Sequence, residues 1–323
     1  MDEQDIGVAD IGGTHARFAF ARIVQGQAPA LGPVTVLKVA DYAGLHDAWR
    51  AFLALSDRPA PSAAALAIAS PIRGDELKFT NSHWRVRPPA LAAELGVDRL
   101  RLVNDFGAVG HAVARLSPQD FIHIAGPEKP LPRPGAASIV GPGTGLGVAL
   151  TLLDAESHRV IETEGGHMGF APRNSFEDAL LARLQVKYGR VSAERVISGP
   201  GLAEIHGALH ADAGANPLDD RALWEAAISG SDPAARASLE RFCACLGAFA
   251  GDVALAHGAN AVVLAGGLLP RIAALLPRTK FAESLVAKGR YTTMMAAMPI
   301  WMITHPQPGL FGAAVAFASG QGA

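Results

Sequence analysis

Residues 5–23 of the chain read DIGVADIGGTHARFAFARI, and this stretch decides the fold class. An apolar run ending in Asp10 predicts one β-strand, and the alternating run Ala16–Ile23 predicts a second. Gly12-Gly13-Thr14 separates the two runs and predicts a tight turn, because glycine adopts the positive φ angles that short hairpins need. Residues 137–153, ASIVGPGTGLGVALTLL, predict the same order of strand, glycine turn and strand about 130 residues further along. The repeat indicates a duplicated core with one glycine hairpin in each half.

The rest of the chain alternates predicted strands with predicted helices. The strands are expected at 34–39, 63–69, 100–103, 261–265 and 300–304, and the helices near 45–55, 89–95, 106–116, 174–187, 201–211, 217–229, 233–257 and 310–318. This alternation predicts an α/β fold. Five prolines within residues 117–136 favour a linker between two lobes, and the apolar last helix favours a return to the first lobe. We therefore expect a small lobe of residues 1–116 plus 305–323 and a large lobe of residues 117–304.

Composition narrows the classes of function. The chain has 323 residues, of which 50% are hydrophobic and 18% charged, and its formal net charge is -2. This balance supports a packed core and gives no electrostatic signal for nucleic acid or an acidic membrane. The acidic start MDEQDIGVAD is unlike a signal peptide, so we expect a cytoplasmic protein. Cys243 and Cys245 lie two residues apart on a predicted helix and point in different directions, which favours buried structural thiols over a metal site.

The two glycine turns are candidates for binding phosphate. Several backbone N–H groups can converge on a phosphate chain only where no side chain holds the backbone away. Thr14 and Thr144 add hydroxyls, and Asp10 adds a carboxylate that can hold Mg²⁺ through water. Neither turn is a Walker loop or a dinucleotide fingerprint. An ordinary hairpin remains the alternative for each turn, although two turns in matching positions favour phosphate.

Asn104-Asp105 ends one predicted strand and precedes a helix. Both residue types are favoured as helix N-caps, which is one interpretation. The other is a general base, because a carboxylate at the end of a parallel strand lies where ligands bind in open α/β sheets. Phosphoryl transfer to an alcohol needs one such group to align the hydroxyl and accept its proton.

A second polar cluster has the composition of a sugar site. Glu164 and His167 flank a glycine pair that allows both side chains to approach one small ligand, and Glu194 is a third candidate. The alternatives are a structural histidine and an exposed helix carboxylate. Asn81 is a further candidate sugar contact, with an Asx-turn as the alternative.

Six segments together resemble the bacterial glucokinase family, in its order and spacing and over nearly the whole chain. They are DIGGT at 10–14, LVNDF at 102–106, GPGTGLG at 141–147, EGGH at 164–167, SAERVISGPG at 192–201 and AGG at 265–267. The resemblance implies an actin-like ATPase (ribonuclease H-like) fold of two lobes with a central cleft. It also implies an ATP:glucose 6-phosphotransferase that uses ATP and Mg²⁺, takes a small-molecule sugar as substrate and forms a homodimer.

The resemblance also implies roles for single residues. Asp105 corresponds to the base for the 6-hydroxyl of glucose, and Asn104, Glu164, His167 and Glu194 correspond to the groups that hold the other hydroxyls. The residues that correspond to the nucleotide site are Ala9, Asp10, Ile11, Gly12, Gly13, Thr14, Gly143, Thr144, Gly145, Gly266 and Gly267.

Some features depart from the family pattern. His15 stands where the family has Asn after Gly-Gly-Thr, and residues 305–309, HPQPG, are richer in proline than the family segment. The zinc-binding cysteine cluster of the related ROK sugar kinases is missing, which argues against that branch.

Two alternatives to an ATP-dependent glucokinase stay open at this stage. One is a kinase for another hexose or with another phosphoryl donor, because specificity among sugars depends on distances between hydroxyls and acceptors. The other is a non-catalytic sugar sensor on the same fold. The sequence carries no helix-turn-helix signal for such a sensor.

Overall fold

The computed structural model describes residues 3–79, 83–210 and 219–320 of the chain. The chain divides into two compact units. Unit 1 contains Met1–Ser117, His158–Glu162 and His305–Ala323, and unit 2 contains Pro118–Ser157 and Thr163–Thr304. None of the helices in the described part of the chain combines the length and apolar character that a membrane crossing requires.

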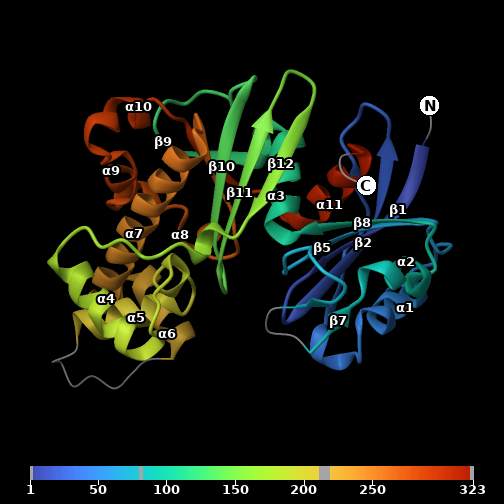
Figure 1. The fold of residues 1–323 in the computed structure, drawn as a ribbon, viewed down its shortest axis with the longest axis horizontal. Helices are drawn as coiled ribbons and strands as arrows, with labels where there is room; N and C mark the ends of the chain where they lie inside the picture. Colours follow the sequence, from blue (N-terminus) through green and yellow to red (C-terminus); the bar gives the residue numbers. More distant parts are fainter. Residues whose placement is uncertain (1–2, 80–82, 211–218, 321–323) are drawn as a thin grey trace. The chain divides into compact units, whose positions relative to one another are not determined.

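Unit 1 is built on a sheet with the strand order β3-β2-β1-β5-β8, and β4 also pairs with β2 (Figure 1). β1 is antiparallel to β2 and parallel to β5, and β5 is parallel to β8. The strands are β1 (Glu3–Ile11), β2 (His15–Val24), β3 (Ala30–Leu31), β4 (Thr35–Lys38), β5 (Ala63–Ile68) and β8 (Arg99–Asn104), with the separate pair β6 (Leu77–Lys78) and β7 (Arg85–Val86). Every residue of β5 is buried, as a parallel strand covered on both faces requires.

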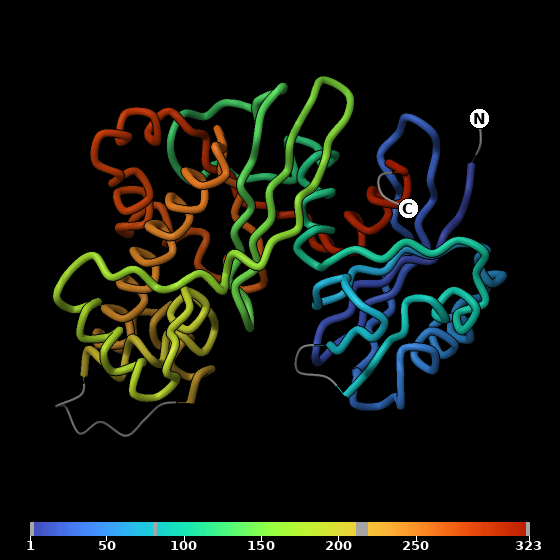
Figure 2. The backbone as a smooth tube through the Cα atoms, viewed as in Figure 1, coloured from blue at the N-terminus to red at the C-terminus, as the bar shows by residue number. Residues whose placement is uncertain are grey.

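Helices cover both faces of this sheet. The helices are α1 (Leu45–Leu55), α2 (Pro88–Leu95), α3 (Asp105–Arg115) and α11 (Pro308–Ala318). On one face, Trp49 and Phe52 of α1 and Leu91 of α2 pack with Phe18 of β2. On the other face, α3 and α11 pack on the strands, and Figure 2 shows the red α11 beside the blue β1 and β2. The C-terminal helix thus completes the core that the N-terminal hairpin begins.

Unit 2 contains strands in the order β11-β10-β13-β14-β9. They are β9 (Phe121–Ala125), β10 (Gly135–Pro142), β11 (Leu146–Leu153), β13 (Ala261–Leu264) and β14 (Ile300–Ile303), and β12 (His158–Thr163) follows β11 along the chain. The helices are α4 (Ser175–Tyr188), α5 (Gly201–Leu209), α6 (Asp220–Ser229), α7 (Pro233–His257), α8 (Leu269–Ile272), α9 (Phe281–Val286) and α10 (Thr292–Ala296). α7 is buried along most of its length, and α5, α6 and α9 pack against it.

The boundaries of α7 match the predicted helix 233–257. Asp232 caps its start, where Oδ1 accepts a hydrogen bond from the backbone N–H of Ala234 at 2.8 Å. Gly258 ends the helix with φ 60°, a left-handed conformation that glycine adopts without strain. Cys243 and Cys245 are buried in this helix, and burial raises the pKa of each thiol to about 12. The prediction that both thiols are buried is confirmed.

The segment 117–136 is more ordered than its prolines suggested. The prediction of a plain linker is wrong for Phe121–Ala125, which forms β9 and pairs antiparallel with β14. The prolines flank this strand and do not interrupt its alternating pattern, so they do not prevent pairing. The predicted hairpins at residues 5–23 and 137–153 are both confirmed as antiparallel pairs.

Candidate functional site

In unit 1 the candidate residues meet at one edge of the sheet. Ile11 at the end of β1 is paired with Ile68 at the end of β5, and Ile68 is paired with Asn104 at the end of β8. Because these three strands are parallel, their carboxyl ends form one row. The first glycine turn leaves this row after Ile11, and Asp105 leaves it after Asn104. The sheet therefore brings Asp10, the turn and Asp105 to the same edge.

The first glycine turn is short and its backbone is accessible. The N–H of Gly12 donates to the carbonyl of His15 at 3.1 Å, and Thr14 is exposed. Ala9 and Ile11 are fully buried in the core of unit 1, and both are paired with β2 on one side and β5 on the other. The turn thus offers backbone groups and one hydroxyl, the donors that a phosphate chain uses.

The carboxylate of Asp10 has little compensating charge. The nearest cation is the guanidinium of Arg17, with 3.9 Å between Nη1 and Oδ2. Burial raises the pKa of Asp10, and Arg17 offsets this only in part. Gly309, in the first turn of α11, lets this helix approach the Asp10 side chain closely. A Cβ at this position would lie 2.7 Å from the carboxylate. A bound cation would stabilise the charged form of Asp10.

Asn104 and Asp105 begin α3. Asn104 is the N-cap, and its Oδ1 accepts hydrogen bonds from the N–H groups of Phe106 at 2.9 Å and Gly107 at 3.1 Å. Its Nδ2 donates to the carbonyl of Ser70 at 3.3 Å. Asp105 is the first helical residue, and its Oδ1 also accepts from Phe106 N–H at 2.8 Å. The N-cap interpretation therefore holds for Asn104, while Asp105 is only partly buried.

In unit 2 the second glycine turn lies beside Gly266. The N–H of Gly143 donates to the carbonyl of Gly145 at 2.8 Å, and the N–H of Gly199 donates to the carbonyl of Gly143 at 2.7 Å. Gly266 has φ 101°, and a Cβ there would lie 2.6 Å from the carbonyl oxygen of Pro142. Glycine is therefore required where the segment after β13 meets the end of β10, and Gly267 next to it is exposed.

The polar cluster of unit 2 gathers around Leu146, the residue after the second turn. The Leu146 N–H donates to Oε2 of Glu194 at 3.0 Å. A Cβ on Gly166 would lie 1.9 Å from the Leu146 carbonyl oxygen, so glycine brings the segment of Glu164 and His167 against this residue. His167 Nε2 lies 4.0 Å from Glu164 Oε2, and both side chains are more than half exposed.

The structure thus sorts the predicted residues into two sets. Unit 1 brings together Asp10, the turn 12–14, Asn104 and Asp105. Unit 2 brings together the turn 143–145, Glu164, His167, Glu194 and the pair 266–267. Asn81 lies outside the described residues. Within the described residues, no three His, Cys, Asp or Glu side chains are grouped as a metal site would require.

Sequence reasoning did not single out Glu162, which the structure places on the start of α3. Its Oε1 accepts a hydrogen bond from the backbone N–H of Asn104 at 2.8 Å. A local signal was present, since Glu162 opens the polar stretch that also contains Glu164 and His167. The partner lies 58 residues away in the chain, however, and no local pattern indicates it.

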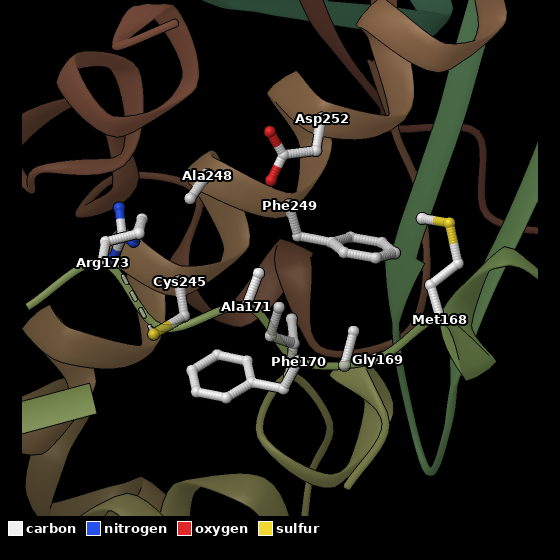
Figure 3. A pocket seen from close by; sticks show the side chains of 11 residues that line it. Met168, Gly169, Phe170, Ala171, Arg173, Cys245, Ala248, Phe249 and Asp252 are labelled. Atoms are coloured by element: carbon white, nitrogen blue, oxygen red, sulfur yellow. Dashed lines mark hydrogen bonds between the residues drawn. The ribbon is translucent and has the colours of Figure 1, made fainter. Parts of the chain in front are cut away.

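A cavity of about 250 Å³ in unit 2 is lined by other residues. Figure 3 shows it between the segment that begins at Met168 and the face of α7 that carries Cys245, Ala248, Phe249 and Asp252. Its lining is mainly apolar. None of the predicted site residues lines it, although Met168 follows His167 directly and Ala193 precedes Glu194.

Comparison with known proteins identifies the relatives of this chain. The family profile described as Glucokinase matches residues 8–320. The glucokinase of Zymomonas mobilis is 50% identical over 317 residues, which cover 98% of each chain. Among solved structures, a glucokinase from an Antarctic psychrotroph has a TM-score of 0.84 at 32% identity, with 97% of this chain and 98% of that chain covered.

A more distant structure bears on the fold alone. It is a ROK family glucokinase from Streptomyces griseus, solved with glucose and AMPPNP, with a TM-score of 0.62 at 18% identity. The match covers 96% of this chain and 98% of that chain. With the closer structure, it confirms the predicted α/β fold of the actin-like ATPases.

Proposed function

This chain belongs to the glucokinase family, and we propose that it transfers the terminal phosphoryl group of ATP to the 6-hydroxyl of glucose. The observation that carries the proposal is the row of strand ends in unit 1. It places a carboxylate, Asp105, at the same sheet edge as a glycine turn suited to phosphate. A phosphoryl-transfer enzyme needs both elements, a group that accepts the hydroxyl proton and donors for the phosphates.

We propose Asp105 as the general base. In the step, the 6-oxygen of glucose forms a bond to the terminal phosphorus as the bond from that phosphorus to the ADP oxygen breaks. The hydroxyl proton passes to the Asp105 carboxylate. Asp105 suits this role because it is partly exposed and anchored at the first position of α3. A positioned base of this kind contributes roughly a hundredfold to ten-thousandfold to the rate.

The sugar's other hydroxyls are assigned to Asn104, Glu164, His167 and Glu194. Because Oδ1 of Asn104 is used as the N-cap, the amide group Nδ2 is left to donate to a hydroxyl, with one hydrogen directed to Ser70. Glu164 and His167 are both exposed and lie within reach of one small ligand. Glu194 accepts from the Leu146 N–H through Oε2, and we assign its Oε1 to a sugar hydroxyl.

The phosphates of ATP are assigned to the two glycine turns, and the adenosine to Gly266 and Gly267. Asp10 fits a magnesium ion held through water, because its burial and its distance from Arg17 leave the carboxylate short of compensating charge. When bound, Mg²⁺ would neutralise charge on the phosphates. Thr14 and Thr144 are exposed and add hydroxyl donors to the turns.

A coupled assay over several sugars and donors tests the function. We expect the highest kcat/KM with glucose and ATP, and a requirement for Mg²⁺. Equal or better turnover with mannose or fructose would overturn the glucose assignment, and equal turnover with polyphosphate would overturn the assignment of ATP. Tight glucose binding with no turnover under any donor would indicate a sugar sensor instead.

We also propose a cytoplasmic location, where ATP is supplied, and a homodimer, as the family resemblance implies. Light scattering on the purified protein tests the second point. A dimer has twice the chain mass of 33.5 kDa, and a mass of one chain would contradict it.

A further inference from the structure

We propose that Glu162 is a positioning residue for Asp105, because it supplies the missing half of a capping box at the start of α3. This inference rests on the proposed function, since it concerns the base assigned there. Glu162, Asn104, Asp105 and Gly107 all belong to unit 1.

One half of a capping box is present within α3. In this motif the N-cap side chain accepts from the N–H of the third helical residue, and a Glu or Gln at that third position accepts from the N-cap N–H. Asn104 makes the first bond, with Gly107 N–H at 3.1 Å. The third helical residue is Gly107, which has no side chain. The second bond therefore cannot come from within the helix.

Glu162 makes that second bond from a distant strand. Its Oε1 accepts from Asn104 N–H at 2.8 Å. Its side chain also fills the space that a side chain at the third helical position would use, because a Cβ on Gly107 would lie 2.4 Å from Oε1 and 2.7 Å from Cγ of Glu162. The glycine and the glutamate thus fit one another, and together they replace a local capping residue.

Two other observations place this strand against α3 and the neighbouring β8. His158, four residues before Glu162, has its Nε2 atom 2.8 Å from Nδ1 of His111 in the middle of α3. Burial lowers the pKa of Arg101 on β8, and the negative charge of the nearby Glu162 offsets this lowering only in part. The strand is therefore held to α3 at two points, one of them the start of the helix.

The consequence concerns the base. Asp105 directly follows the residue whose N–H Glu162 holds, so the bond fixes the chain where Asp105 leaves β8. A misplacement of about 1 Å in a catalytic group costs roughly a hundredfold in rate. Glu162, near the end of β12, also precedes Glu164 by two residues, so the contact that fixes the base lies close in sequence to a residue assigned to the sugar.

Four variants test the role of Glu162 against wild type. We expect Glu162→Ala to lower kcat about tenfold to a hundredfold, with a smaller change in KM for glucose. Glu162→Gln should recover most of kcat, because its amide oxygen accepts the same bond. The double variant Glu162→Ala/Gly107→Glu should also regain activity, since it restores the acceptor at the third helical position in the space that Glu162 vacates. Gly107→Glu alone should lose activity, because Glu162 still occupies that space.

Glu94→Ala, which removes an exposed carboxylate from α2 of the same unit, serves as the control. Thermal unfolding of every variant separates loss of folding from loss of catalysis, and the two rescues apply even if Glu162→Ala folds poorly. Wild-type kcat in Glu162→Ala would overturn the inference, as would Glu162→Gln that is no better than Glu162→Ala, or a double variant without rescue. If Asp105→Asn is inactive while Glu162→Ala is normal, only this inference fails. If Asp105→Asn is fully active, the proposed base fails as well.

Discussion

The Oε2 atom of Glu194 accepts a hydrogen bond from the backbone N–H of Leu146 at 3.0 Å, directly after the second glycine turn. The same carboxylate lies against the turn itself, since a Cβ on Gly145 would be 2.5 Å from Oε2. A residue assigned to the sugar therefore contacts the turn assigned to phosphate. This contact predicts that glucose binding and ATP binding are coupled through unit 2.

Gly145→Ala tests that link. The added methyl group displaces Glu194, so we expect KM for glucose and KM for ATP both to rise about five- to tenfold, or about 1–1.4 kcal/mol. Gly143→Ala in the same turn is the comparison: a Cβ there meets no atom within 4 Å and leaves Glu194 in place, so only KM for ATP should change. Steady-state kinetics with each substrate varied in turn provide the measurement. If KM for ATP alone changed in both variants, glucose binding and ATP binding would not be coupled through Glu194.

The buried pair His111–His158 predicts how stability depends on pH. Burial first, then the charges of His158 and Arg101, lower the pKa of His111 from 6.5 to about 3. Between these pH values the unfolded chain binds a proton that the folded chain does not. The free energy of unfolding should therefore fall as pH decreases below about 6.5, by up to about 1.4 kcal/mol per pH unit from this group.

His111→Gln removes this titration and should give a shallower pH dependence than wild type. Urea unfolding at several values between pH 7.5 and 4.5 provides the free energies, and the difference in slope isolates His111 from the carboxylates. His46→Gln, at a half-exposed site, is the control. Parallel slopes for wild type and His111→Gln would show that the pair does not act in this way.

The contact between α3 and α11 predicts a cost for Gly312→Ala. A Cβ on Gly312 would lie 1.8 Å from the carbonyl oxygen of Ala108, so the two helices must separate. We expect a loss of about 1–3 kcal/mol in the free energy of unfolding, as for overpacked cores. Because α3 begins with Asp105, kcat should also fall. Gly169→Ala, where a Cβ meets nothing within 4 Å, is the control, and equal stability of both variants would refute the expectation.

The sequence predicts the elements of this fold better than the contacts between them. Both glycine hairpins were predictable because alternating apolar residues and glycine act locally. The position of Asp105 at a strand end followed from the same pattern. β9 was missed because prolines on either side of Phe121–Ala125 resemble a linker, and its pairing with β14 is a tertiary contact.

In the candidate site, too, local motifs were predictable and tertiary contacts were not. The glycine turns and the polar residues were visible as motifs, and the structure groups them by unit. The sequence left the N-cap role of Asn104 open, because that role depends on hydrogen bonds that only the folded chain shows. Glu162 belongs to the same polar stretch as Glu164, but its role could not be predicted, because its partner Asn104 lies 58 residues away and its fit to Gly107 requires the folded chain.

The central claim is that Asp105 accepts the proton of the sugar hydroxyl, and Asp105→Asn tests it most directly. The substitution keeps the oxygen that accepts from Phe106 N–H, so the start of α3 should be preserved. Asp98→Asn, at an exposed position before β8, is the control. We predict that Asp105→Asn lowers kcat by about a hundredfold to ten-thousandfold while the Kd for glucose, measured by calorimetry, changes only a few fold. A kcat near that of wild type would contradict the account.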